Sequence, residues 1–264
     1  MKVGMIGAGN MAEAIWGGML HSGFCKPEDI IVSRRSEAAL EKIQSQYGIR
    51  TTTDNVQVAK ECDLLFLAVK PQFLNTVITE IKEVIREEQI LISIAAGKTI
   101  EWLEAAFAKP IKLIRTMPNT PALVGEGCTG ICANEQVSEE EKELALQIFA
   151  SVGKAFFIEE RLMDTVGALS GSSPAYVFMM IEAMADGAVA GGLPRTQAIE
   201  MAAQTFLGSA KLLLESGKHP GQLKDMVCSP GGTTIRGLQV LEERALRGAI
   251  IDALQACIEQ SKKL

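Results

Sequence analysis

Histidine is scarce in this chain of 264 residues, which has only His21 and His219. Closely paired cysteines are also missing, because the chain contains no CxxC motif and no histidine cluster beside a cysteine. Its six cysteines are scattered as Cys25, Cys62, Cys128, Cys132, Cys228 and Cys257. Zinc sites need closely spaced ligands, so we expect no metal. Scattered thiols are typical of a reducing compartment, and we expect a cytoplasmic protein.

A surplus of basic residues and a long hydrophobic run are absent too. The net charge is −6, so we do not expect a nucleic-acid partner, which is usually bound through a basic surface. The longest uncharged stretch of the second half, residues 165–181, is broken by glycine, serine and proline, and we expect no membrane span. Glu13 interrupts the apolar N-terminus, which argues against a signal peptide.

Short apolar runs alternate with helical stretches through the first half of the chain. The runs predict strands over residues 2–6, 29–33, 49–53, 63–69 and 90–95. Helices are predicted between them, among others over residues 11–22 and 36–47. Strands that alternate with helices indicate parallel βαβ units, and continuous apolar runs suit strands covered on both faces. The first half therefore predicts a Rossmann-type, doubly wound parallel sheet in the α/β class.

The second half is rich in alanine, methionine and leucine and predicts helices only. Its predicted helices span residues 174–190 and 194–215, with others beginning near Thr233 and Arg244. Pro174 and Pro194 stand in first helical turns, where proline costs no hydrogen bond. We therefore predict two domains, an α/β domain over residues 1–162 and an all-helical domain over residues 163–264.

A glycine-rich turn follows the first predicted strand and opens the first helix, over Gly7–Ala12. Gly7 permits the tight turn, Gly9 lets backbone N–H groups approach a pyrophosphate, and Ala12 is small enough for helix and sheet to pack closely. The helix N-terminus adds unpaired N–H groups and a positive dipole end. The turn thus predicts a dinucleotide site that uses Gly7, Gly9, Asn10 and Met11.

The end of the second predicted strand decides which dinucleotide the site favours. NAD enzymes usually place an acidic residue there to accept hydrogen bonds from the ribose. This chain instead has Ser33, Arg34 and Arg35, and a guanidinium can bind a 2′-phosphate through two hydrogen bonds. The alternative is that both arginines are solvated surface charges. The missing acid favours NADPH, with NADH as the less favoured cofactor.

The segment Cys228–Ile235 (CSPGGTTI) is the most unusual in the chain. Physically it is a flexible loop that feeds a helix N-terminus, which can bind a carboxylate. The alternative is a plain capped helix start with a threonine as N-cap, although this leaves the paired glycines unexplained. Local chemistry alone leaves both interpretations open.

Taken as a whole, the chain resembles the pyrroline-5-carboxylate reductases, which perform the last step of proline biosynthesis. The resemblance covers nearly all 264 residues and rests on segments that occur in order: 7–12, 65–71 (LFLAVKP), 95–97 (AAG), 117–121 (MPNTP), 169–176 (LSGSSPAY), 219–223 (HPGQL) and 229–241 (SPGGTTIRGLQVL). The last segment is the family's signature. Ser173 departs from the family, which commonly has glycine there; we expect this serine to cap the helix ahead of Pro174.

The resemblance implies that NADPH reduces 1-pyrroline-5-carboxylate to L-proline by hydride transfer to the C=N carbon. It also implies that the helical C-terminal domain forms a homodimer, with a ring of dimers as a further assembly. The cofactor residues it implies are Ser33, Arg34, Arg35, Asn55, Ala68, Lys70, Pro71 and Ala96. The substrate carboxylate is assigned to Ser229, Gly231, Gly232 and Thr233, and the ring nitrogen to Thr234 as the catalytic residue.

Two other functions share parts of this pattern. Hydroxyacid and ketopantoate-type dehydrogenases have the same two-domain plan, but they need an acid or base, usually a lysine on a C-terminal helix. The predicted helix over residues 174–190 contains no lysine. An NADPH-binding regulator would need no anion-binding turn, so the turn within residues 228–235 argues against this function.

Several single residues have alternative roles. For Lys70 a solvated lysine at the surface is as well supported as a role in the cofactor cleft. For His219 a structural role is favoured, and Glu182 and Asp186 could face water or a partner helix.

Overall fold

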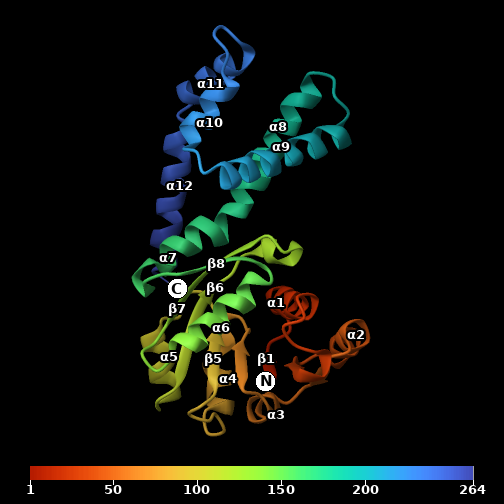
Figure 1. Ribbon diagram of the computed structural model, residues 1–264, viewed down its shortest axis with the longest axis vertical. Helices are drawn as coiled ribbons and strands as arrows, with labels where there is room; N and C mark the ends of the chain where they lie inside the picture. Colours follow the sequence, from red (N-terminus) through yellow and green to blue (C-terminus); the bar gives the residue numbers. More distant parts are fainter. Residues whose placement is uncertain (264) are drawn as a thin grey trace. The chain divides into compact units, whose positions relative to one another are not determined.

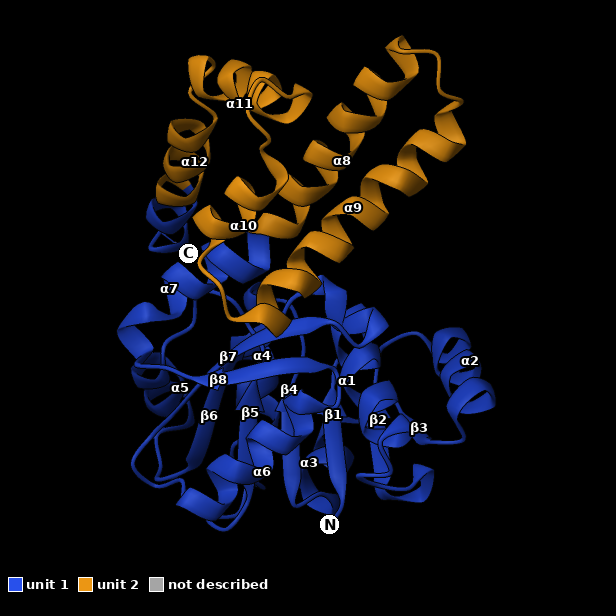
Figure 2. Cartoon of the chain, turned by 45° about the horizontal axis from the view of Figure 1, so that its top comes forward, with its two compact units in different colours: residues 1–172, 257–264 blue, residues 173–256 orange. Residues whose placement is uncertain are grey.

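The structure, a computed structural model, describes residues 1–263 and divides them into two compact units (Figure 2). Unit 1 contains residues 1–172 and the segment that begins at Cys257, and unit 2 contains residues 173–256. The chain thus passes from unit 1 to unit 2 between Ser172 and Ser173. The division into functional domains at residues 162 and 163 stays a prediction.

Unit 1 is built on one sheet, whose colour runs from red through yellow to green along the chain (Figure 1). Its eight strands follow the order β3-β2-β1-β4-β5-β6-β7-β8 and are labelled in Figure 2. The strands are β1 (Val3–Ile6), β2 (Ile30–Ser33), β3 (Arg50–Thr52), β4 (Leu64–Leu67), β5 (Ile90–Ser93), β6 (Lys112–Met117), β7 (Gly127–Ala133) and β8 (Gly153–Phe157). Neighbouring strands are parallel except β6 and β7, which are antiparallel. The predicted Rossmann-type sheet is confirmed. Ligands of such sheets bind beyond the carboxyl ends of the strands, where the strand order reverses, here between β1 and β4.

Helices cover both faces of this sheet. The helices of unit 1 are α1 (Asn10–His21), α2 (Glu37–Tyr47), α3 (Asn55–Glu61), α4 (Pro71–Ile81), α5 (Ile100–Phe107), α6 (Glu139–Ala150) and α7 (Met163–Val166). Side chains alternate along each strand, so Leu64 and Phe66 enter one core with α1, α2 and α6. Leu65 and Leu67 enter a second core with α3, α4 and α5. Two apolar cores therefore enclose the sheet.

Four short segments complete unit 1. Three are short 3₁₀-helices, η1 (Pro27–Asp29), η2 (Thr120–Val124) and η3 (Glu160–Leu162). The fourth is a π-helical segment, η4 (Gly167–Ser172), which continues α7 and runs directly into the first helix of unit 2. The helix therefore does not begin at Ser173, and the expectation that Ser173 caps a helix start is wrong. Its backbone φ is not positive, so serine meets no left-handed strain there.

Unit 2 consists of helices, as the sequence predicts. They are α8 (Ser173–Ala190), α9 (Arg195–Ser216), α10 (Pro220–Val227), α11 (Thr233–Glu243) and α12 (Leu246–Ser261), whose last turns belong to unit 1. Asp186 and Arg195 form an ion pair with an N–O distance of 2.6 Å that links α8 to α9. At the start of α10, Nδ1 of His219 accepts a hydrogen bond from the N–H of Gly221 at 3.1 Å, which is the structural role that the sequence favours.

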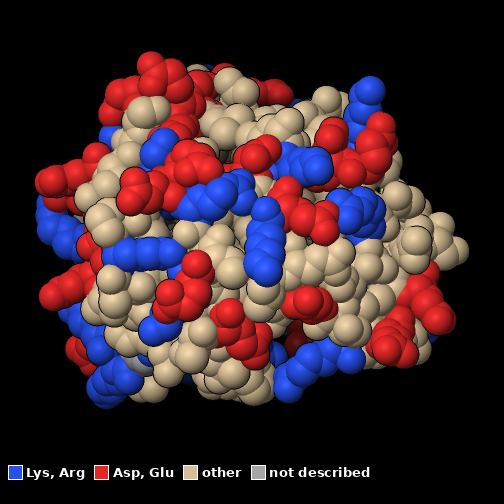
Figure 3. Space-filling model, turned by 90° about the horizontal axis from the view of Figure 1, so that it is seen from below, with Lys and Arg blue, Asp and Glu red and all other residues tan. Residues whose placement is uncertain are grey.

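Acidic and basic side chains are interspersed over the face shown in Figure 3, so this face carries no continuous basic surface. Within residues 1–263, none of the helices combines the length and the apolarity that a bilayer crossing requires. In the same residues, no three His, Cys, Asp or Glu side chains gather as a metal ion would need.

Candidate active site

The glycine turn lies between β1 and α1, at the carboxyl edge of the sheet. Gly7 has a φ of +101°, and a Cβ there would lie 2.6 Å from the carbonyl oxygen of Ala68. Only glycine therefore suits this close approach of two strands. Gly9 is the N-cap of α1, forms no side-chain cap, and a Cβ there would meet no atom within 4 Å. The N–H groups of the first turn of α1 are thus open for a ligand.

A cavity of about 500 Å³ extends from this turn to the end of β2. It is lined by Gly7, Ala8, Gly9, Ser33, Arg34, Arg35, Ser36, Thr53, Asn55, Ala68, Val69, Lys70, Phe73, Thr76, Val77 and Glu80. We name it the adenosine-side cavity, after the part of the cofactor that the sequence predicts at the end of β2. Its positive charge comes mainly from two arginines. Nη1 of Arg34 donates to the carbonyl oxygen of Ala8 at 3.2 Å, and the guanidinium of Arg35 lies 4.9 Å from the ring centre of Phe73.

A second cavity of about 500 Å³ also includes Ala68, Val69 and Lys70 in its lining. We name it the nicotinamide-side cavity, because the family resemblance assigns Ala96, another of its lining residues, to the nicotinamide. The other lining residues are Met11, Pro71, Ile94, Ala95, Ala96, Met117, Pro118, Gly167, Ala168, Gly171, Ser172, Cys257, Gln260 and Ser261. All of them belong to unit 1. Its walls are mainly apolar, with the Lys70 side chain at the boundary to the adenosine-side cavity. The two cavities together offer one continuous lining for an elongated ligand.

The loop before α11 leads into a helix start that no side chain caps, and it lies in unit 2. Gly231 has a φ of +68°, and the N–H of Gly232 donates to the carbonyl oxygen of Ser229 at 3.0 Å. A Cβ on Gly232 would collide with the Ser229 side chain. Gly231 therefore has a backbone conformation that favours glycine, whereas a side chain at Gly232 would require the Ser229 side chain to move. Gly232 itself is the N-cap of α11 and no side chain caps it, so the interpretation of a threonine N-cap is wrong.

The comparisons with known proteins agree over the whole chain. Residues 160–264 match a family model described as pyrroline-5-carboxylate reductase dimerisation, and residues 2–97 match one described as NADP oxidoreductase, coenzyme F420-dependent. Over 263 residues the chain is 48% identical to the pyrroline-5-carboxylate reductase of Escherichia coli, with 100% of this chain and 98% of that one covered. This chain belongs to the pyrroline-5-carboxylate reductase family.

Solved structures of reductases from this family have the same fold. The pyrroline-5-carboxylate reductase of Coxiella burnetii matches with a TM-score of 0.93 and 38% identity over 99% of this chain and 97% of that one. A Plasmodium falciparum pyrroline carboxylate reductase with NADP bound matches with a TM-score of 0.90 and 34% identity, over 100% and 97%. The chain is accordingly an oxidoreductase with an NADP-type cofactor domain. The hydroxyacid dehydrogenase and regulator alternatives have no support in these relatives.

The cofactor residues expected for a pyrroline-5-carboxylate reductase gather in unit 1. Gly7, Gly9, Ser33, Arg34, Arg35, Asn55, Ala68 and Lys70 line the adenosine-side cavity, and Met11, Ala68, Lys70, Pro71 and Ala96 line the nicotinamide-side cavity. Asn10 lines neither, but it is the first residue of α1. The residues around Gly9 fit a pyrophosphate, because Gly9 lines the cavity and leaves open space where a Cβ would stand. The expected substrate residues Ser229, Gly231, Gly232, Thr233 and Thr234 gather separately, around the start of α11 in unit 2.

One residue that the sequence did not single out supports the nicotinamide-side cavity. Asn119 follows β6 and is buried; its Nδ2 donates to the carbonyl oxygen of Ser170 at 2.9 Å, and its Oδ1 accepts from the N–H of Cys128 at 2.8 Å. In an α-helix the N–H of residue 174 would serve that Ser170 carbonyl, but Pro174 has none. Asn119 therefore replaces the missing donor and holds η4 against the end of β6. The sequence shows the two motifs MPNTP and LSGSSP that contain these residues. It does not show that the two motifs are in contact, so the role of Asn119 could not be predicted.

Proposed function

We propose that this chain reduces 1-pyrroline-5-carboxylate to L-proline with NADPH. The observation that carries the proposal is its 48% identity over the full chain to a reductase of that name. The two cavities of unit 1 and the loop of unit 2 supply residue types suited to such a reaction. When bound, the nicotinamide supplies the hydride that adds to the C=N carbon.

NADPH rather than NADH is proposed from the adenosine-side cavity. No acidic residue ends β2, and the side chains that follow it are Ser33, Arg34 and Arg35. All three line the cavity, where guanidinium groups can neutralise the charge of a 2′-phosphate. Arg34 is already oriented by its hydrogen bond to Ala8, next to the turn proposed to hold the pyrophosphate.

The start of α11 is proposed to bind the substrate carboxylate. Its uncapped first turn presents N–H groups and the positive end of the helix dipole, and both favour an anion. Ser229, Gly231, Gly232 and Thr233 would hold the carboxylate, largely through backbone groups. Thr234 would form a hydrogen bond with the ring nitrogen, since its hydroxyl can donate to a neutral imine or accept from the N–H of a protonated one. A protonated imine already accepts hydride readily, so Thr234 orients the nitrogen and need not supply the proton.

Replacement of Thr234 tests this assignment. Removing one preorganised hydrogen bond of this kind typically costs about 10²–10³ in rate, and we expect Thr234→Ala to lower kcat by roughly tenfold or more. The affinity for NADPH should stay nearly unchanged, because Thr234 lies in unit 2 and the cofactor cavities lie in unit 1. Thr234→Ser keeps the hydroxyl and should retain most of the activity. Wild-type turnover by Thr234→Ala would remove Thr234 from the reaction.

The substrate class is tested by following NADPH oxidation with pyrroline-5-carboxylate and, separately, with 2-ketoacids. Oxidation with the cyclic imine alone supports the proposal. Oxidation with ketoacids alone would instead favour a hydroxyacid dehydrogenase, and no oxidation with any of them would favour a binding protein.

The assembly and the location of the protein are proposed from the same family. Residues 160–264 match a dimerisation model, and we propose a homodimer formed through these helices, with a ring of dimers as a larger assembly. All six cysteines are free thiols, in keeping with a cytoplasmic protein. Measuring the mass in solution by light scattering over a range of concentrations distinguishes monomer, dimer and ring.

A further inference from the structure

A chain of two hydrogen bonds crosses the wall of the adenosine-side cavity. Oγ of Ser33 lies 2.7 Å from Oδ1 of Asn55, and Nδ2 of Asn55 lies 2.7 Å from Oε2 of Glu80. The three residues come from the end of β2, the start of α3 and the last turn of α4. All three line the cavity. Glu80 is thus an acidic group in the same cavity as the two arginines, although no acid follows β2 in the sequence.

The chemistry of Glu80 determines the direction of both hydrogen bonds. An ionised carboxylate only accepts hydrogen bonds, so the amide nitrogen of Asn55 must face Glu80. The amide oxygen of Asn55 then faces Ser33, and because this oxygen also only accepts, the Ser33 hydroxyl must donate. A serine hydroxyl has a single proton. While Glu80 holds Asn55 in this orientation, Ser33 can offer only its lone pairs to a ligand in the cavity.

The two nicotinamide cofactors differ in what they require at this point. A ribose 2′-hydroxyl can donate a hydrogen bond to the lone pairs of Ser33, whereas the oxygens of a 2′-phosphate only accept and need a donor. The negative charge of Glu80 in the same cavity also opposes the phosphate. In its present orientation Ser33 therefore suits NADH, and Arg34 and Arg35 suit NADPH.

We propose that Glu80 is a positioning residue that sets how strongly the enzyme discriminates between NADPH and NADH. Through Asn55 it keeps the Ser33 proton away from the 2′-phosphate and so limits the preference for NADPH that the arginines supply. This inference rests on the proposed use of NADPH. NAD enzymes carry an acidic side chain after the second strand. Glu80 on α4 would be its counterpart in this chain, and it would act through the neighbouring amide of Asn55.

The substitution Glu80→Gln tests the proposal with little change of shape. A glutamine amide can both donate and accept, so Asn55 can turn its amide over and release the Ser33 hydroxyl to donate to a 2′-phosphate. A hydrogen bond to a charged group is gained, and we expect the ratio of NAD⁺ to NADP⁺ dissociation constants to rise about tenfold. The measurement is titration calorimetry of both cofactors with the full-length protein.

Glu83→Gln is the matched control, because it removes the same charge just beyond the end of α4 from a side chain that does not line the cavity. The ratio of NAD⁺ to NADP⁺ dissociation constants of Glu83→Gln should equal that of the wild type. A merely structural role of Glu80 would lower the melting temperature of Glu80→Gln and leave the ratio unchanged. An unchanged ratio therefore overturns the proposal.

A double-mutant cycle with Ser33→Ala separates release of the hydroxyl from simple removal of charge. If Glu80 acts through Asn55 and Ser33, the gain from Glu80→Gln disappears when Ser33 is alanine. An equal gain in both backgrounds would mean that charge alone is responsible, which overturns the role of Asn55 and Ser33. Wild-type protein that binds NAD⁺ as tightly as NADP⁺ would contradict the proposed NADPH preference itself. A wild-type preference for NADP⁺ with an unaltered ratio in Glu80→Gln would contradict only the role of Glu80.

Discussion

The two units of the chain bury their apolar side chains to very different extents. Unit 1 completely encloses large residues such as Trp16, Phe66 and Phe149. Unit 2 buries only small hydrophobic residues, Ala185, Ala198 and Ala202. Its exposed large hydrophobic residues are Phe178, Met179, Met184, Ile199, Met201, Leu207, Leu212, Leu214, Met226, Val227, Ile235, Val240, Leu241 and Ile251. Burial of apolar area is the main stabilising contribution to a fold, so unit 1 has its own core and unit 2 lacks one.

This difference indicates how the work of the enzyme is divided along the chain. Exposed apolar side chains in such number mark a surface that is covered in the functional state. Because residues 160–264 match a dimerisation model, we expect a second copy of this chain to cover it. Unit 1 can therefore hold a cofactor as a single folded unit. The loop before α11, which we propose to bind the substrate, belongs to helices whose apolar surface needs a partner.

The largest expected effect comes from a charge in the apolar surface of unit 2. Met179 on α8 is 63% exposed, and we expect Met179→Glu to raise the dimer dissociation constant on the order of a hundredfold, because burying an unpaired charge is costly. Light scattering measures the dissociation. NADP⁺ binding by unit 1 should persist in the dissociated protein, whereas activity should be lost.

The matched control is Met179→Leu, which keeps an apolar side chain of similar volume and should retain the dimer. If Met179→Glu assembles as the wild type does, Met179 lies outside the interface. If it dissociates and also loses NADP⁺ binding, the independence of unit 1 is wrong.

The next largest effect concerns the open space in front of Gly9. A valine there would occupy this open space at the lining of the adenosine-side cavity, since a Cβ meets no protein atom within 4 Å. Loss of the phosphate contacts at the start of α1 should weaken NADP⁺ binding on the order of a hundredfold, because hydrogen bonds to charged groups contribute about 1.5–3 kcal/mol. The midpoint of urea unfolding should stay close to that of the wild type.

Gly17→Ala, in the middle of α1, is the control for Gly9→Val. A Cβ at Gly17 also meets nothing within 4 Å, and alanine should stabilise the helix by roughly 0.5–1 kcal/mol without changing cofactor affinity. Equal NADP⁺ binding by Gly9→Val and the wild type would place the pyrophosphate elsewhere.

A smaller effect is expected from Asn119, which joins η4 to the rest of unit 1. Asn119→Ala leaves the carbonyl oxygen of Ser170 and the N–H of Cys128 without their partner. An unsatisfied buried group costs about 1–3 kcal/mol, and we expect a loss of that size in the free energy of unfolding. Urea unfolding of unit 1, followed by the fluorescence of the buried Trp16, measures it.

A second substitution shows whether the loss arises at Ser170. Pro174→Ala restores an N–H that can donate to this carbonyl oxygen, so it should recover part of the stability in the Asn119→Ala background. Asn75→Ala, on the exposed surface of α4, should be neutral. Wild-type stability of Asn119→Ala would show that water satisfies both groups.

The sequence predicted best those strands that are continuous runs of apolar residues. The strands β1, β2, β4 and β5 lie within the predicted ranges, because each is buried on both faces. No strand was expected at β6, β7 or β8. β6 carries Lys112 and Arg115 among its apolar residues, β7 contains glycines and β8 is largely exposed. The π-helical η4 was also missed. It depends on a proline and on an asparagine 51 positions away from Ser170, and a local pattern cannot report such a contact.

The candidate site was predictable where a motif carries its chemistry along a few adjacent positions. The glycine turn and the residues after β2 are of this kind. Glu80 was missed, because it joins Asn55 across 25 positions and stands at the end of an ordinary amphipathic helix. Its role depends on the contact between the Glu80 carboxylate and the Asn55 amide, and only the folded chain brings these two groups together.

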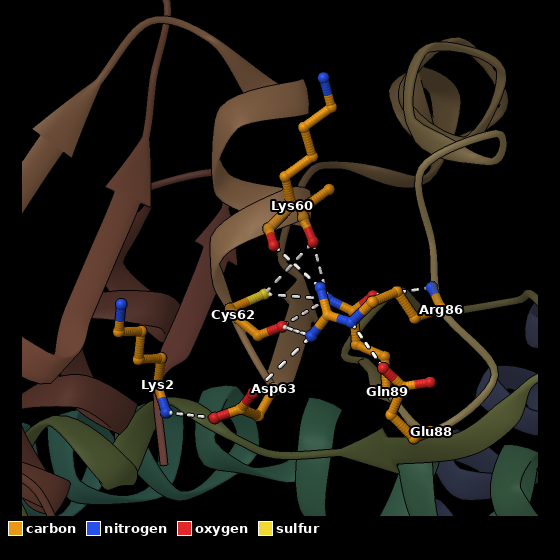
Figure 4. Close-up of polar contacts among 8 residues, drawn as sticks. Lys2, Lys60, Cys62, Asp63, Arg86, Glu88 and Gln89 are labelled. Carbon is orange, nitrogen blue, oxygen red and sulfur yellow. Dashed lines mark hydrogen bonds and ion pairs between the residues drawn. The ribbon is translucent and has the colours of Figure 1, made fainter.

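At the amino-terminal ends of β1 and β4, the opposite edge from the cofactor cavities, a polar cluster surrounds Cys62 (Figure 4). Nε2 of Gln89 lies 2.8 Å from the carbonyl oxygen of Cys62 and 3.2 Å from its Sγ, and Nη2 of Arg86 donates to the same carbonyl oxygen at 2.9 Å. Burial raises the pKa of the Cys62 thiol from an ordinary value of 9.0 to about 11, although the hydrogen bond from Gln89 opposes the rise.

The smallest effect we predict is a pH dependence of stability that arises from this thiol. Between pH 9 and 11 the unfolded chain releases the Cys62 proton while the folded chain keeps it. The unfolded state then binds fewer protons, so the free energy of unfolding falls as the pH rises, by at most about 1.4 kcal/mol per pH unit from this group. Urea unfolding of unit 1 at pH 8 and pH 10 should show a smaller fall for Cys62→Ala than for the wild type. Cys228→Ala, in the sparsely buried unit 2, should leave the wild-type fall unchanged. Equal falls in all three proteins would mean that the Cys62 thiol contributes nothing.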